Sequence, residues 1–289
     1  MKKALFIFAF TCFGLSISAQ TIEWNKSNTN VQTDSIAKKI LEPAQYLITY
    51  TYKFVRNAKY PNDKRSGMTI LQIGNRYNRF CDYYELKFDS ICDELSRGKM
   101  SVTEASPLML GALKKSVFTE GILIDKQKNK ETIQRTAGII TQKYQYEENC
   151  PKLEWEILKG DTIIAGYHCN KAKTKLFGRE YIAWYSTDVN MPYGPYKFNG
   201  LPGLVLSVMD TQGHFEFTLD GLQKSNKYAP IYLWDNKDIV KTSRKTVRNI
   251  YKNFCADPVS ALTSDGSIEI PDDVKATVEP KPYNPMELE

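Results

Sequence analysis

The sequence predicts a mainly β (α+β) protein, built as one large, curved antiparallel β-meander with a few helices packed on it. Three observations support this fold class. Short apolar stretches bounded by Gly, Asp or Asn recur about every ten residues from residue 132 onward, which is typical of strands joined by tight turns. Connections of that length cannot hold the crossover helices of a parallel sheet. The 18 Tyr and 13 Phe among the 289 residues suit half-buried sheet faces, because the rings pack there and tyrosine hydroxyls still reach water.

Residues 1–20 have the pattern of a secretory signal peptide, which is not expected to be part of the fold. Basic residues precede an apolar stretch at 4–15, and small residues mark a cleavage site near Ala19-Gln20. No Cys lies beside that site, so no lipid anchor is predicted. No later stretch approaches the roughly 18 apolar residues that a membrane-spanning helix needs. We therefore expect an extracytoplasmic protein, periplasmic or secreted, without a transmembrane segment.

We expect a single mainly β domain over residues 21–257 and an extended, partly disordered C-terminal tail over residues 258–289. The tail is rich in Pro, Asp and Glu and has few large apolar residues, so it cannot bury enough apolar surface to fold by itself. At the other end of the domain, residues 21–40 are polar with little periodicity and predict an arm or a short helix.

The domain is expected to begin with a hairpin. Gln45–Arg56 alternates apolar with polar residues, which is the period of a strand buried on one face, and Met68–Ile73 is expected to pair with it. Another strand follows at Tyr77–Tyr84. The apolar spacing then becomes helical over Phe88–Leu95, with a start signal at Asp89.

Further strands are expected to follow a short helix near residues 108–118. A final amphipathic helix is predicted over Asp238–Phe254, and we interpret its basic face as solvent-exposed rather than membrane-binding. The strands predicted between these two helices are Ile122–Asp125, Thr132–Arg135, Ile139–Tyr146, Glu154–Leu158, Thr162–Lys173, Glu180–Thr187, Leu204–Met209, His214–Leu219 and Ile231–Trp234.

A stretch dense in Gly and Pro connects two of these strands. Leu201-Pro202-Gly203-Leu204 fits a type II turn, because Pro presets φ at the second position and Gly accepts a positive φ at the third. The structural interpretation is a sharp corner before a core strand. The functional interpretation is that the glycines let the backbone approach a ligand or partner closely. The ligand-binding candidates under that interpretation are Trp184, Phe198, Gly200, Pro202 and Gly203.

The aromatic residues of the predicted strands allow two interpretations. The stripe on Gln45–Arg56, together with the aromatic residues of later strands, forms either the core of the sheet or the lining of a cavity for an apolar ligand, as curved open sheets allow. The later aromatic residues are Trp155, Tyr181, Trp184 and Phe198.

Seven short motifs occur once each, in order, along the chain. They are GYHCNKA at 166–172, GR at 178–179, AWY at 183–185, MP at 191–192, GPYKF at 194–198, GLPGLV at 200–205 and NPMEL at 284–288. Together they resemble the GLPGLI family of exported proteins of Bacteroidetes-type bacteria, with Val205 in place of the family's Ile, over residues 45–289. The resemblance implies an exported β-rich protein of undefined biochemical role, without catalytic residues to carry over. The meander is also similar in shape to the open half-barrel of lipoprotein carriers.

The sequence lacks four common enzyme signatures. After residue 20 there is no HExxH, no G-x-S-x-G, no P-loop and no G-x-G-x-x-G. His168 adjoins Cys169, but neighbours on a strand point to opposite faces, so the two cannot directly form the hydrogen bond that a catalytic pair needs. We interpret Cys169 as a core residue or as half of a disulfide. The chain has only two His, and neither has Cys or a carboxylate at ligand spacing. We therefore predict no catalytic residues, no metal site and no cofactor.

Cysteine usage keeps one enzymatic hypothesis open. An odd number of Cys in an oxidising compartment leaves at least one free thiol or an intermolecular bond, and the pairing cannot be predicted from spacing. A thiol-redox or hydrolytic enzyme is therefore retained as the weakest hypothesis. The Cys beyond the predicted signal peptide are Cys81, Cys92, Cys150, Cys169 and Cys255.

The net charge of the chain does not indicate that it binds nucleic acid. The formal net charge of +6, which falls to +4 without Lys2 and Lys3, is too small to indicate nucleic acid. The leading hypothesis is an exported, non-enzymatic protein that binds an apolar small molecule or an envelope protein. The alternative is an interaction module that docks on a partner through its tail, prompted by the defined ending Asn284–Leu288.

Overall fold

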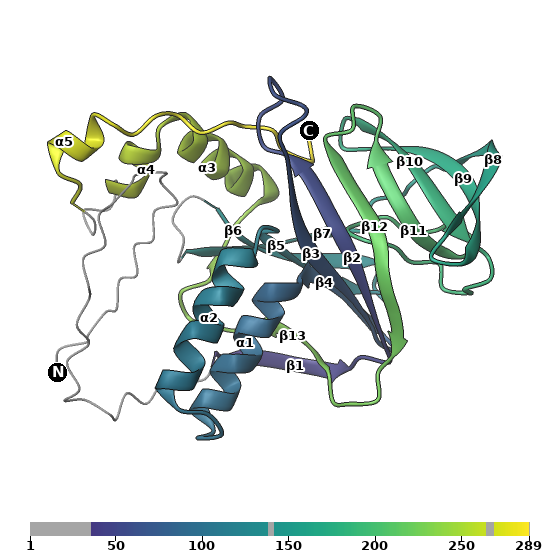
Figure 1. Cartoon of the computed structure of the whole chain (residues 1–289), viewed down its shortest axis with the longest axis horizontal. Coiled ribbons are helices and arrows are strands. Elements are labelled where there is room, and N and C mark those ends of the chain that lie inside the picture. Colours follow the sequence, from purple (N-terminus) through teal and green to yellow (C-terminus); the bar gives the residue numbers. More distant parts are fainter. Residues whose placement is uncertain (1–35, 138–141, 264–268, 289) are drawn as a thin grey trace. The chain divides into compact units, whose positions relative to one another are not determined.

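The computed structural model describes residues 36–137, 142–263 and 269–288, which belong to one compact unit spanning Thr33–Glu289 (Figure 1). The predicted signal peptide and residues 21–35 of the predicted arm lie outside the described residues. Both therefore stay predictions.

Most of the described strands belong to one open sheet. In chain order they are β2 (Tyr46–Val55), β3 (Lys64–Ile73), β4 (Tyr77–Asp82), β5 (Glu120–Asp125), β6 (Lys130–Thr136), β7 (Lys143–Asn149), β8 (Glu156–Ile164), β9 (Tyr167–Leu176), β10 (Arg179–Ser186), β11 (Leu204–Asp210), β12 (Phe215–Lys224) and β14 (Val240–Lys241). Across the sheet the order is β14-β7-β6-β5-β4-β3-β2-β12-β11-β10-β9-β8, and only β14 with β7 is parallel. Because β14 and β8 do not pair with each other, the sheet is not closed. The predicted fold class is confirmed: the chain is mainly β, with a large antiparallel sheet and few helices.

A small second sheet and the helices complete the described fold. β1 (Lys38–Pro43) pairs antiparallel with β13 (Pro230–Trp234). The helices are α1 (Tyr83–Ser96), α2 (Val102–Lys115), α3 (Arg244–Ala256), α4 (Pro258–Thr263) and α5 (Asp272–Lys275). Figure 1 shows α1 and α2 side by side next to β1 and β13. None of these described helices has the length and apolar character that crossing a bilayer requires.

Asp82 decides where α1 begins. One carboxylate oxygen accepts two backbone N–H groups of the helix's first turn, and the other accepts the N–H groups of Val117 and Phe118 just after α2. A carboxylate in this position satisfies amides that the helix itself leaves unpaired. The helix therefore starts at Tyr83, and the prediction that it spans only Phe88–Leu95 is wrong.

Asp89, the predicted start signal, lies inside α1 and is buried. Its carboxylate accepts hydrogen bonds from the Tyr232 hydroxyl and the Trp234 indole, both at 2.6 Å, and so ties α1 to β13. The Arg79 guanidinium lies over both aromatic rings, 4.1 and 5.2 Å from their centroids. Asp89 therefore connects α1 to β13 rather than marking the start of a helix.

Several predicted boundaries are wrong where the chain turns or is capped. The predicted strand Thr162–Lys173 is broken by a turn at Ala165 and Gly166, which both have positive φ, so its two parts belong to β8 and β9. α3 begins at Arg244 rather than Asp238, because the Ser243 side chain accepts the amide of the first turn. Residues 38–43 form β1 instead of an arm or helix.

The Gly/Pro stretch turns more tightly than a type II turn. The Gly203 amide donates to the Leu201 carbonyl at 2.8 Å, whereas the Leu204 amide donates to Val189. This is the i→i+2 bond of a γ-turn centred on Pro202, so the predicted turn type is wrong. A Cβ at Gly203 would overlap the Ser186 carbonyl oxygen, because the two backbones touch where β11 begins beside β10. The glycine is required by this close approach within the chain.

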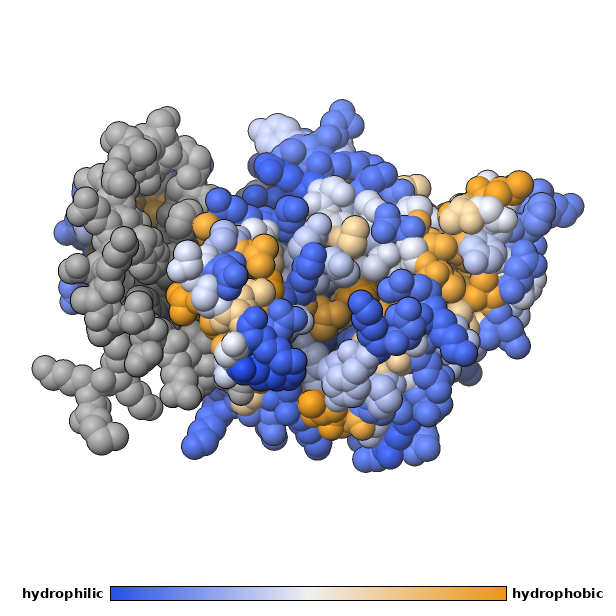
Figure 2. Space-filling view, turned by 60° about the horizontal axis from the view of Figure 1, so that its bottom comes forward, coloured by the Kyte–Doolittle hydropathy of each residue, from blue (hydrophilic) through white to orange (hydrophobic). Residues whose placement is uncertain are grey.

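The main core lies on one face of the sheet and is rich in aromatic side chains. Tyr50, Tyr181, Phe198 and Phe217 are all 1% exposed or less. Outside the core, apolar side chains form small separate groups among hydrophilic ones on the face shown in Figure 2, one of them at the right-hand end, where β8 and β9 lie.

Candidate functional site

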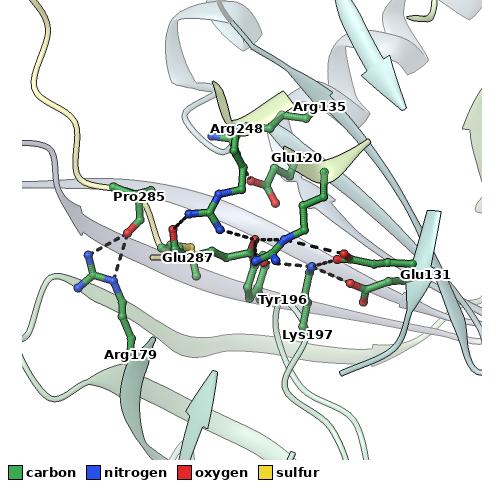
Figure 3. A network of polar contacts seen from close by, with 12 residues as sticks. Glu120, Glu131, Arg135, Arg179, Tyr196, Lys197, Arg248, Pro285 and Glu287 are labelled. Atoms are coloured by element: carbon green, nitrogen blue, oxygen red, sulfur yellow. Dashed lines mark hydrogen bonds and ion pairs between the residues drawn. The ribbon is translucent and has the colours of Figure 1, made fainter. Parts of the chain in front are cut away.

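A buried lysine lies at the centre of a cluster of charged side chains. Lys197 lies in the segment between β10 and β11, and its side chain is 0% exposed. Its Nζ is 2.6 Å from Glu131, 2.7 Å from Glu148 and 3.0 Å from Glu287 (Figure 3). Burial alone would lower the pKa of Lys197, but the surrounding carboxylates outweigh it and raise the pKa, so the amine is charged. A buried charge of this kind is retained only with such partners.

One of the three carboxyl groups does not carry a full negative charge at neutral pH. Burial raises the pKa of Glu131 to about 8, helped by Glu148 and opposed by Lys197. Three carboxylates cannot all be ionised around one ammonium group at this separation without strong repulsion. The proton therefore resides on Glu131, the least exposed of the three.

Glu287 brings the C-terminal segment into this charged region. The Tyr196 hydroxyl donates to its carboxylate at 2.5 Å, and Arg244 donates to it from Nε at 3.0 Å and Nη2 at 2.8 Å. Arg248 Nη2 donates to its backbone carbonyl at 2.7 Å. Burial would raise the pKa of Glu287, but Lys197 and Arg244 outweigh that effect and lower it. Glu287 is therefore an anion held by three cations.

Arg179 fixes the residues just before Glu287. Its side chain, 4% exposed, donates to Asn284 Oδ1 at 2.8 Å and to the Pro285 carbonyl at 2.8 and 3.1 Å (Figure 3). It also pairs with Asp210 at 3.1 Å. The NPMEL motif is therefore docked on the protein's own sheet. The region predicted as an extended tail contains α4 and α5 and then returns to the core in extended form.

A cavity of about 560 Å³ lies beside this charged region. Its walls come from β2, β3, α2 and the segment after it, β5, β6, β12, α3, and residues 281–287, some of which also form the network described above. The aromatic lining residues are Tyr52, Phe54, Phe118, Phe215, Tyr251, Phe254 and Tyr283, and the charged ones are Arg56, Arg65, Lys114, Arg135, Arg248, Lys281, Glu120 and Glu287.

Two arginines of the lining lie deeper than the other cations. Arg135 Nη1 pairs with Glu120 at 2.9 Å, and its guanidinium lies 4.6 Å from the centroid of the Tyr251 ring. Arg248 points from α3 toward Glu287, as Figure 3 shows. Arg135 Nε and Arg248 Nη1 are buried without a hydrogen-bond partner among the described residues. Arg248 Nη1 has only a longer contact, 3.9 Å, to a Glu287 carboxylate oxygen.

None of the five ligand-binding candidates chosen from the sequence lines this cavity. Phe198 is buried in the core, edge-on to Tyr181 with ring centroids 4.8 Å apart. Trp184 is half-buried on β10, and Gly200 and Pro202 are exposed in the connection before β11.

The sequence predicted several of the segments that line the cavity, but it predicted each one separately. The aromatic stripe of β2 supplies Tyr52 and Phe54, which stack with centroids 5.0 Å apart. The helix that carries Arg248 was predicted as amphipathic, and the closing motif supplies the remaining wall. No pattern along the chain indicates that these three segments meet.

The thiols are free, and their environments do not activate them. All five cysteines in the described parts of the chain are unpaired. Burial raises the pKa of Cys81 to about 12 and of Cys92 and Cys150 to about 11, and it also raises the pKa of Cys169 and Cys255. A nucleophilic or redox-active cysteine needs the opposite shift.

His168 and Cys169, the neighbours that the sequence predicts cannot hydrogen-bond to each other directly, both lie on β9. His168 is exposed and Cys169 is buried, as expected for neighbours on β9. Within residues 36–137, 142–263 and 269–288, no group of three or more His, Cys, Asp or Glu side chains is arranged to hold a metal ion.

Comparison with known proteins yields structural neighbours only. No family model matches the sequence, and no curated protein matches it. Two solved structures of PNGF-II, from different crystal forms, match 73% of this chain with TM-scores of 0.46 and 0.48 and sequence identities of 16% and 17%. The chain spans about a third of their length, 34% and 33%. At this level of similarity nothing about activity or ligands follows for the chain.

Proposed function

We propose that this protein is an exported, non-enzymatic member of the GLPGLI family that binds an apolar small molecule in the cavity between β2, β3 and α3. The observation that carries the proposal is the cavity itself: about 560 Å³, with seven aromatic side chains in its lining. Ligand sites in proteins are concave, mostly apolar and of roughly 300–1,000 Å³.

The walls of the cavity support a preformed site. Tyr52 stacks between Phe54 and Phe217, with centroids 5.0 and 4.7 Å away, so its ring has little freedom to collapse into the space. The NPMEL segment, whose Met286 sulfur contacts the Tyr52 hydroxyl, is held by Arg179 and by the ion pair between Glu287 and Arg244. A site with walls fixed in this way loses little conformational entropy when a ligand binds.

Export and family membership are supported by sequence patterns. The basic, apolar and small-residue order of residues 1–20 is that of a secretory signal, and the seven motifs of the family occur in order. The absence of an activated thiol among the described cysteines, whose pKa values are all raised, supports a binding role over a thiol-dependent reaction.

A fluorescence titration tests the proposal. N-phenylnaphthylamine, a neutral apolar dye that brightens in apolar surroundings, should bind the purified protein saturably, with one dye per chain. Thr119→Trp places a bulky ring at the exposed rim of the cavity and should weaken binding several-fold. Thr211→Trp, the same change at an exposed turn outside the lining, should not.

Two outcomes would contradict the proposal. One is an absence of saturable dye binding. The other is equal binding by the Thr119 and Thr211 variants, which would place the dye elsewhere. If the dye does bind in the cavity, mass spectrometry of organic extracts of the protein purified from its native envelope should identify the molecule that fills the cavity in the cell.

A further inference from the structure

We infer that the molecule bound in this cavity is an amphiphile with one anionic head group, and that Arg248 and Arg135 hold the head group. The inference rests on the proposed function and adds the chemical class of the ligand. Six of the charged lining residues are basic and two are acidic, in a wall that is otherwise rich in aromatic rings. In such a lining, the apolar part of a ligand can pack against the aromatic rings and its acidic group can pair with a basic side chain.

The two acidic residues of the lining are already committed to cations of the chain. Glu120 pairs with Arg135 at 2.9 Å, and Glu287 pairs with Lys197 at 3.0 Å and with Arg244 at 2.8 Å. A cationic ligand would have to break one of these buried pairs to find an anion. An anionic ligand can bind without breaking the ion pairs of Glu120 and Glu287. We therefore expect the head group to be negatively charged.

The two deeper arginines have N–H groups to offer. Arg135 Nε and Arg248 Nη1 are buried and lack a hydrogen-bond partner among the described residues, although each guanidinium has a carboxylate or carbonyl partner on another nitrogen. A buried N–H without a partner is unfavourable, and an oxygen of a bound head group would satisfy it. The planar guanidinium also matches the oxygen spacing of carboxylate, sulfate or phosphate groups.

The apolar part of the ligand has a neighbouring wall. The Tyr251 ring lies 4.6 Å from the Arg135 guanidinium, and Phe118 is edge-on to Tyr52, with centroids 5.5 Å apart. The arginines and the rings therefore lie within one cavity. A chain of methylene groups can contact the rings while its head group reaches the guanidinium groups.

Competition among three amphiphiles of equal chain length tests the inference. Laurate and dodecyltrimethylammonium, each kept below its micelle concentration, and dodecanol, kept below its solubility limit, should displace N-phenylnaphthylamine with different affinities. We expect laurate to bind at least tenfold more tightly than dodecanol and the cationic compound to bind most weakly. Equal affinities for laurate and dodecanol would overturn the inference while leaving the proposed function intact. If none of the three binds and the dye does not bind, the proposed function fails and the inference fails with it.

Variants on α3 locate the head group. Arg248→Gln should reduce the laurate-to-dodecanol affinity ratio at least five-fold, whereas Arg248→Lys, which keeps the charge, should retain most of it. Lys252→Gln removes the same charge from an exposed position of the helix outside the lining and should leave the ratio unchanged. Because the readout is a ratio of two affinities, a general loss of folded protein does not mimic the result. An unchanged ratio in Arg248→Gln would overturn the assignment.

Discussion

Lys197 shows at the scale of a single residue how this fold keeps charge in its interior. Its ammonium group has three carboxyl neighbours within 3.0 Å and no exposure to water. Removing one member of such a group leaves its partners buried without compensation, which costs more than the group contributes as a whole.

Lys197→Met should therefore destabilise the protein by about 3–5 kcal/mol at neutral pH, because three carboxyl groups lose their shared cation. The measurement is the urea-unfolding free energy. Lys175→Met, at a side chain that is 78% exposed, is the control and should change stability by no more than about 0.5 kcal/mol. A loss as small as that of the control would show that the carboxyl groups simply take up protons.

Glu131 predicts a dependence of stability on pH. Its pKa rises from 4.5, the ordinary value, to about 8 in the folded protein, so the folded state binds more protons than the unfolded chain between these values. Stability from this group is complete below pH 4.5 and falls as the pH rises toward 8, by at most about 1.4 kcal/mol per pH unit. The lowered pKa of Glu287 changes the stability only at pH values below about 4.5, which is outside the range in which Glu131 acts.

Glu131→Gln should flatten that decline, because an amide keeps the neutral form at every pH. Urea unfolding of both proteins from pH 5.5 to 8.5 measures the difference. Other buried carboxyl groups with raised pKa values, such as Glu120, affect both proteins alike, so the comparison isolates Glu131. Parallel curves would mean that Glu131 is ionised in the folded protein.

At the scale of an element, the C-terminal segment acts as part of the fold. Residues 284–288 bridge β10, the connection before β11 and α3 through contacts with Arg179, Tyr196 and Arg248. The hypothesis that this ending docks on a partner would require it to leave these buried contacts.

Deleting residues 284–289 should accordingly lower the stability by about 3–5 kcal/mol, since several buried cations each lose one of their partners at once. The effect is measured as a fall in melting temperature. Leu288→Ala, at a side chain that is 51% exposed, should have little effect and serves as the control. Unchanged melting together with lost binding partners in pull-down experiments would favour the docking hypothesis instead.

Gly203 sets the path of the connection between β10 and β11. Gly203→Ala should destabilise the protein by about 2 kcal/mol or more, because the new methyl group would overlap the Ser186 carbonyl oxygen. Gly111→Ala, inside α2 with no atom within 4 Å of the new methyl group, should instead stabilise by about 0.5–1 kcal/mol. Equal effects of the two substitutions in urea unfolding would contradict this account.

At the scale of the whole described fold, the ligand proposal predicts stabilisation by mass action. Laurate at roughly 100 times its dissociation constant should add about 2.7 kcal/mol to the unfolding free energy. Differential scanning fluorimetry should show a melting temperature that rises with laurate concentration, and Arg248→Gln should need more laurate for the same rise. A melting temperature independent of laurate would contradict binding to the folded state.

The sequence by itself determined the features that depend on local spacing. The alternation of Gln45–Arg56 predicted β2 and its buried face, and turn residues at short intervals predicted the antiparallel sheet. The amphipathic spacing that predicted α3 was also local. These predictions held because side-chain direction repeats with a fixed period along a strand or helix.

Only the tertiary structure decided which segments meet. β2 lies between β3 and β12, and Lys197 is surrounded by carboxyl groups from β6, β7 and the C-terminal segment. Asp82 and Asp89 both have a side chain that can cap a helix. In the structure Asp82 caps α1, whereas Asp89 is buried against β13. Four of the five ligand-binding candidates were placed on the Gly/Pro stretch and Trp184 on the strand before it, whereas the cavity lies between β2, α3 and residues 281–287. Contacts between distant segments depend on how whole elements pack, and no period along the chain records them.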